Sequence, residues 1–199
     1  MDATPPPLPA SPYANVHLSG HVIAASTITV AAAAVRVKDS SRLATAWLAD
    51  CGQWGADAVP TPSRVTGRND LLIAGLRAVS KAVQALRRDH LDEDIVIQCG
   101  DGETARFLRL WMDGKPVSPE GYELERSGSK PSSLEWLMGE LGEFGGSYAL
   151  ADVVAGSGLE GAAWKVAGLT ARAARKELER DELREEAAAV VEAALGVHT

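Results

Sequence analysis

Residues 66–101 constrain the fold of this chain most strongly, because they combine one long amphipathic helix with one short buried strand. Apolar side chains recur along the helix at steps of three and four positions, which places them on one face: Leu72, Leu76, Val79, Val83 and Leu86. A polar turn leads into the largely apolar, β-branched run 95–99, which is typical of a buried strand. One carboxylate opens the helix at Asp70 and another follows the strand at Asp101. If helix and strand pack together, these two carboxylates can share a site.

The composition is that of a soluble globular protein with one sizeable core. The chain has 199 residues, of which 46% are hydrophobic and 24% are charged. No apolar run is long enough to cross a bilayer, and the first residues lack the basic region of a secretory signal, so we expect no membrane contact. Two cysteines without an export signal favour a cytoplasmic location. A net charge of −7 argues against a general nucleic-acid coat protein but does not exclude a nucleic-acid enzyme.

The pattern along the chain predicts three strands, a helix, a strand, two helices, a strand and a final helix. Beside the helix that opens at Asp70, the expected strands are residues 16–26, 28–38, 43–49, 95–99 and 148–154, and the expected helices are 104–111, 134–141 and 159–195. The segment 52–68 contains prolines and glycines and is expected to be a loop. Short turns between the first three strands predict an antiparallel meander. The alternation that follows predicts an α/β fold with a mixed sheet.

This order of elements, together with four short motifs, resembles the ribonuclease H family from residue 16 to residue 175. The motifs are 66–72, where an asparagine precedes an acid; 97–101, which ends in an aspartate; Trp111 with the later run 133–137; and 154–156. The resemblance implies a mixed five-stranded sheet, three antiparallel strands and then two parallel ones, flanked by helices, with an extended C-terminal helix. It implies three segments: a disordered proline-rich arm (1–14), a ribonuclease H-like domain (15–176) and an acidic, alanine-rich helical extension (177–199).

In that family four carboxylates hold two Mg²⁺ ions, which activate a water molecule and stabilise the leaving oxygen of a phosphodiester. Asp70 matches the helix acid, although the family normally has glutamate there, and Asp101 matches the strand acid. The acid of the first strand is expected near Ala25 or Ser26, and that of the final helix near Ala167. None of these three residues carries a carboxylate. The resemblance therefore supports two of four acids and no complete two-metal site.

The candidate catalytic residues are Asp70 and Asp101, and the candidate metal ligands are Asp70, Asp101 and Glu103. We expect at most one Mg²⁺ or Mn²⁺ site, or none. Each residue also has a plainer interpretation, which the sequence leaves open. Asp70 suits the positive end of a helix, Asp101 suits a turn between two glycines, and Glu103 suits a solvated surface.

Three functions compete on these observations. The first, which we favour, is a ribonuclease H-like protein with an incomplete acidic set and weak or no nuclease activity, associated with nucleic acid or acting in assembly. The second is an active metal-dependent ribonuclease H-type phosphodiesterase that cleaves the RNA of RNA–DNA hybrids. The third is a protein-interaction module without nucleic-acid contact. The C-terminal helix is a candidate surface for self-association or a protein partner, because Val190, Val191 and Leu195 would otherwise be exposed.

Overall fold

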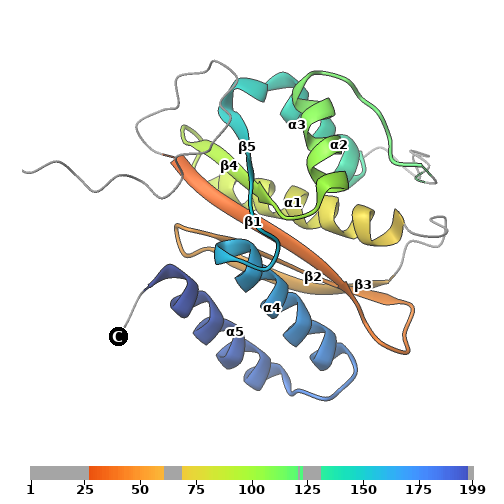
Figure 1. Ribbon diagram of the computed structural model, residues 1–199, viewed down its shortest axis with the longest axis vertical. Helices are drawn as coiled ribbons and strands as arrows, with labels where there is room; N and C mark the ends of the chain where they lie inside the picture. Colours follow the sequence, from red (N-terminus) through yellow and green to blue (C-terminus); the bar gives the residue numbers. More distant parts are fainter. Residues whose placement is uncertain (1–26, 61–68, 121, 123–130, 197–199) are drawn as a thin grey trace, which may run out of the picture.

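Five strands form one mixed sheet in the order β3-β2-β1-β4-β5 (Figure 1). The structure, a computed structural model, describes residues 27–60, 69–120, 122 and 131–196. The strands are β1 (Thr27–Arg36), β2 (Arg42–Ala49), β3 (Trp54–Pro60), β4 (Asp94–Cys99) and β5 (Tyr148–Asp152). β1 runs antiparallel to β2 and β2 antiparallel to β3, whereas β4 is parallel to both β1 and β5. The predicted sheet, with three antiparallel and then two parallel strands, is confirmed.

Helices cover both faces of the sheet (Figure 1). They are α1 (Asn69–Asp89), α2 (Gly102–Met112), α3 (Ser133–Glu143), α4 (Gly158–Ala174) and α5 (Arg180–Leu195), with a short 3-10 turn, η1 (Gly145–Ser147). Large side chains such as Ile97, Leu108 and Trp111 fill the core between the sheet and α1, α2 and α3. The opposite face, beneath α4 and α5, is built largely from small residues such as Ala31 and Ala163. Small side chains let a helix approach a sheet closely, so α4 lies tightly across β1 and β2.

The first strands are shifted along the chain relative to the sequence prediction. The expected strand 16–26 lies outside the described residues, and the expected strands 28–38 and 43–49 are β1 and β2. The third strand of the meander is β3. The prediction that residues 52–68 form a loop is therefore wrong for residues 54–60. Glycine and proline are tolerated there because β3 is an edge strand. Gly55 has a specific reason: a Cβ at this position would lie 2.6 Å from Nε1 of Trp47.

The C-terminal region forms two helices rather than one extended helix. Lys176 adopts a left-handed backbone conformation, with φ of 61°, just after α4 ends, and α5 then packs along α4 (Figure 1). Val191 is buried against the small-residue face, and Val190 and Leu195 are partly buried there. The reason given for a partner surface, that these side chains would be exposed, is therefore wrong. Self-association through this helix stays a prediction, and so do the domain limits.

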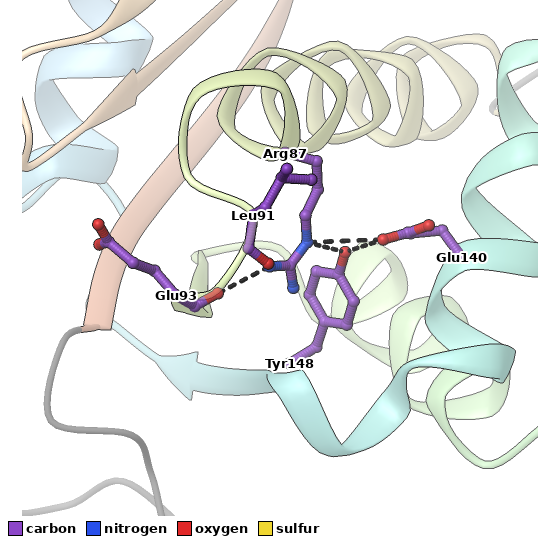
Figure 2. Close-up of polar contacts among 5 residues, drawn as sticks. All are labelled: Arg87, Leu91, Glu93, Glu140 and Tyr148. Atoms are coloured by element: carbon purple, nitrogen blue, oxygen red, sulfur yellow. Dashed lines mark hydrogen bonds and ion pairs between the residues drawn. The ribbon is translucent and has the colours of Figure 1, made fainter.

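Arg87 connects the end of α1 to β5 and α3 through hydrogen bonds and an ion pair (Figure 2). Its Nε–H donates to the hydroxyl oxygen of Tyr148 at 2.8 Å, and that hydroxyl donates to Oε1 of Glu140 at 2.5 Å. The guanidinium lies 4.7 Å from the centre of the tyrosine ring, and Nη1 donates to the carbonyl oxygens of Leu91 and Glu93. Burial, and then the hydrogen bond to Glu140, raise the pKa of Tyr148 above its usual value. This network fixes the turn that leads into β4.

No helix in the described ranges is long and apolar enough to cross a membrane. Both cysteines, Cys51 and Cys99, are free.

Candidate functional site

A pocket of about 650 Å³ lies where the carboxyl-terminal halves of β1 and β4 meet the starts of α1, α2 and α4. Its floor is built from small residues: Ala32, Ala33 and Ala34 of β1 and Gly100 after β4. β1 and β4 are adjacent and parallel, so their carboxyl ends open at the same edge of the sheet. The absence of large side chains on this floor leaves the space that the pocket occupies.

Asp70 lies at the start of α1, with only 4% of its surface exposed. Arg36, the last residue of β1, holds it with two hydrogen bonds: Nη1 to Oδ2 at 2.5 Å and Nη2 to Oδ1 at 2.6 Å. The backbone N–H of Leu71 also donates to Oδ1, at 2.8 Å. Asp70 is not among the described residues that line the pocket. Both of its oxygens are engaged by a cation that the chain itself supplies.

Asp101 and Glu103 do line the pocket, at the start of α2. Asp101 is the N-cap of this helix, and its Oδ2 accepts hydrogen bonds from the backbone N–H of Thr104 at 2.8 Å and from the Thr104 hydroxyl at 2.6 Å. Glu103 is exposed and pairs with Arg106 at 3.1 Å. The structure thus brings Asp101 and Glu103 to one pocket and leaves Asp70 outside it.

Of the positions expected for the two missing acids, the structure describes only the one on the final helix. Ala25 and Ser26 lie outside the described residues. Ala167 is fully buried in the small-residue core of α4, so it faces away from the pocket. A carboxylate nevertheless reaches the pocket from α4, and it comes from Glu160, in the first turn of that helix.

Glu160 is only 7% exposed. Its Oε2 accepts a hydrogen bond from the backbone N–H of Gly156, and its Oε1 lies beside Gly100, where an added Cβ would come within 2.7 Å of it. In the part of the chain that the structure describes, no lysine or arginine pairs with Glu160. The sequence did hold a signal for it, because Ser157 and Glu160 have the three-residue spacing of a capping box at the start of a helix.

Trp164 follows Glu160 by one helical turn and lines the same pocket, with 57% of its surface exposed. Cys99 also lines the pocket. Burial, and after it the negative charge of Asp101, raises the pKa of its thiol to about 12, while Arg109 acts in the opposite direction. The thiol therefore stays protonated at neutral pH and is a poor nucleophile.

Within the described ranges, no group of three or more histidine, cysteine, aspartate or glutamate residues is placed to hold a metal ion. The three carboxylates that line the pocket, Asp101, Glu103 and Glu160, do not converge on one point as the ligands of paired Mg²⁺ ions must, and Asp70 is held by Arg36. The residues present at this pocket do not fit a two-metal centre. A single Mg²⁺ or Mn²⁺ ion at Asp101 and Glu103 stays a prediction.

Comparison with known proteins adds little to this description. No family model matches the chain, and no curated protein matches it. Among solved structures, the solution structure of the PFV RNase H domain matches with 10% sequence identity and a TM-score of 0.35, over 64% of this chain and 77% of that chain. A likeness at this level establishes neither a family nor an activity. The order and directions of the five strands are themselves those of a ribonuclease H-like α/β sheet.

Proposed function

We propose that this protein is a ribonuclease H-like binding protein, with weak or no nuclease activity, that uses the pocket at the starts of α1, α2 and α4 for a partner in assembly. One observation carries the proposal: Arg36 holds both oxygens of Asp70. A guanidinium already supplies the positive charge that a metal ion would bring to this carboxylate. Hydrolysis by two metal ions needs that carboxylate free and pointing at the reaction centre.

The rest of the pocket supports binding over catalysis. Where carboxylates would have to converge, the floor consists of alanines and Gly100. The protonated thiol of Cys99 offers no nucleophile in their place. Asp101 caps α2, a structural role that engages its Oδ2.

The charge of the pocket favours a protein partner over nucleic acid. Its described lining includes three carboxylates, Asp101, Glu103 and Glu160, and no lysine or arginine. A nucleic-acid backbone is drawn to clustered basic side chains, and these carboxylates repel it unless metal ions intervene. An acidic pocket with an exposed tryptophan suits a polypeptide with basic side chains.

The test is a cleavage assay with the full chain and an end-labelled RNA–DNA hybrid in Mg²⁺ or Mn²⁺. The wild type is expected to cleave no faster than Asp101→Asn, which controls for a contaminating nuclease. Glu192→Gln, an exposed carboxylate on α5 outside the pocket, is the matched control. Cleavage by the wild type and by Glu192→Gln that disappears in Asp101→Asn would contradict the proposal.

A second assay separates a nucleic-acid partner from a protein partner. Binding of the same hybrid is measured by fluorescence anisotropy between about 50 and 200 mM salt, a range over which phosphate contacts weaken steeply. We expect no salt-sensitive binding. Tight binding that falls steeply with salt would favour nucleic-acid association instead.

A further inference from the structure

We propose that the pocket takes a basic side chain of a protein partner, an arginine in particular, with its guanidinium between the carboxylate of Glu160 and the ring of Trp164. The inference rests on the proposed function, because it treats the pocket as a binding site, and it names the chemistry that the site recognises.

Glu160 provides the first reason. Its surface is 93% buried, since 7% is exposed, yet within the described residues its carboxylate has a single hydrogen bond, from Gly156 to Oε2. Oε1 lies at the pocket beside Gly100, without a donor in that part of the chain. A buried carboxylate costs free energy unless a cation or several hydrogen bonds compensate it. Its open oxygen is therefore a site for a positively charged donor that comes from outside.

Trp164 provides the second reason, independent of the carboxylates. It stands four positions after Glu160 on α4, so both side chains lie on the same side of the helix and both line the pocket. More than half of its surface is exposed, which is unusual for the largest apolar side chain in a small domain. A tryptophan face attracts a guanidinium or ammonium ion, and arginine stacks on it most often.

The remaining walls suit the stem of such a side chain. Leu71 and Leu72 line the pocket from α1, and they offer apolar surface to the methylene groups that carry the charge. Asp101 and Glu103 lie on the α2 side and add negative potential. An acidic pocket with these walls accommodates an amphipathic cation better than a compact metal ion, which needs several converging oxygens.

The chain already contains the proposed type of contact. At the start of α1, Arg36 binds Asp70 through two charge-assisted hydrogen bonds of 2.5 and 2.6 Å. Glu160 occupies the corresponding place at the start of α4, in the first turn of its helix. The difference is that no described arginine reaches it.

The test uses N-acetyl-arginine methylamide and its neutral isostere N-acetyl-citrulline methylamide, titrated at constant ionic strength into ¹⁵N-labelled full-length protein. The readout is the indole N–H signal of Trp164, assigned from the signal that Trp164→Phe lacks. We expect saturable shifts with a millimolar dissociation constant for the arginine probe, and at least about tenfold weaker binding of the citrulline probe, which lacks the charge. Glu160→Gln should weaken the arginine probe by a similar factor.

Two control variants sharpen the result. Phe144→Ala removes another exposed aromatic residue, at the end of α3, and Glu192→Gln removes a carboxylate outside the pocket. Both variants should bind the arginine probe as the wild type does. Equal shifts with the two probes, no saturable shift with either, or unchanged binding by Glu160→Gln would each overturn the inference. The comparison of the two probes needs the wild type and, for the assignment alone, Trp164→Phe, so it holds even if Glu160→Gln folds poorly.

Different results would contradict the proposed function and the proposed arginine ligand. Cleavage of the hybrid that depends on Asp101 contradicts the proposed function, whatever the probes do. Absence of both cleavage and probe binding leaves the proposed function standing and removes only the basic side chain as its ligand.

Discussion

Two buried carboxylates, each in the first turn of a helix, differ in the partners that the described residues give them. Asp70 at the start of α1 is 4% exposed and is held at both oxygens by Arg36. Glu160 at the start of α4 is 7% exposed and has one backbone donor, with no cation among the described residues. The helix dipole favours a negative charge at both places, by an amount on the order of 0.3–1 kcal/mol, which does not compensate a buried charge by itself.

This difference indicates that Asp70 serves the stability of the fold and that Glu160 serves the binding of a ligand. Asp70 joins the end of β1 to the start of α1 and thereby contributes to the stability of the fold. Glu160 borders the pocket and keeps an open oxygen there, so its charge serves a ligand better than it serves the fold. The two carboxylates should therefore differ in how much each contributes to the free energy of unfolding.

The largest effect is expected for Asp70→Asn. The variant removes a buried charge from a two-bond pair and leaves Arg36 without its partner, so the free energy of unfolding should fall by about 2–4 kcal/mol. Urea unfolding followed by circular dichroism measures the change. Arg36→Ala should also lower the free energy of unfolding, because it leaves the buried Asp70 carboxylate without its cation. A change in Asp70→Asn no greater than that of Glu192→Gln would mean that the Arg36 pair adds nothing.

A smaller effect is expected for Tyr148→Phe. The ring and its contact with Arg87 remain, but the hydroxyl that links Arg87 to Glu140 is lost, which should cost about 1–2 kcal/mol (Figure 2). The raised pKa of Tyr148 adds a pH test. The folded state holds the proton more tightly than the unfolded state, so this stabilisation is complete below pH 10.0, the ordinary tyrosine value, and is lost at higher pH. Above that pH, the wild type should lose stability faster than the variant.

Glu160→Gln should leave the free energy of unfolding unchanged or raise it by no more than about 1 kcal/mol. The amide oxygen can still accept the hydrogen bond from Gly156, and the substitution removes a buried charge that lacks a described partner. Differential scanning calorimetry measures the shift in melting temperature. A loss as large as that of Asp70→Asn would show that the fold itself depends on the Glu160 charge, which would erase the distinction between the two carboxylates.

The smallest effect on stability, and the clearest on reactivity, concerns Cys99 in the pocket lining. Its pKa is raised from 9.0 to about 12, so the stabilisation from its protonated form is complete below pH 9 and is lost as pH rises towards 12. At pH 8, iodoacetamide should modify the exposed Cys51 well before Cys99. Mass spectrometry of the digested protein gives both rates. In urea the two rates should converge; equal rates in the folded protein would mean that this lining is open and wet.

The hydrophobic periodicity of the sequence and the residues typical of helix starts were sufficient to predict the helices and strands around the pocket. The apolar stripe from Leu72 to Leu86 is the buried face of α1, and the run before Gly100 is β4. The helix start at Ser132 was also predictable, since Ser132 and Glu135 form a capping box. These signals are local, so neighbouring residues are enough to specify them.

The pairing of charges was not predictable, because it depends on tertiary structure. Arg36 and Asp70 stand 34 positions apart, and only the sheet and α1 together bring them into contact. Counting from Gly156 along a family pattern placed the last acid at Ala167, whereas the carboxylate that reaches the pocket is Glu160. β3 was missed because an edge strand bears less hydrophobic pattern and tolerates glycine and proline.

The most direct test of the central claim, that Arg36 engages Asp70 so fully that no metal ion binds there, is a Mn²⁺ titration of the full chain followed by electron paramagnetic resonance of the free ion. The predicted result is at most one weak site, which Asp101→Asn weakens and Asp70→Asn leaves unchanged. Two saturable Mn²⁺ sites filled at micromolar concentration, and lost in both Asp70→Asn and Asp101→Asn, would contradict it.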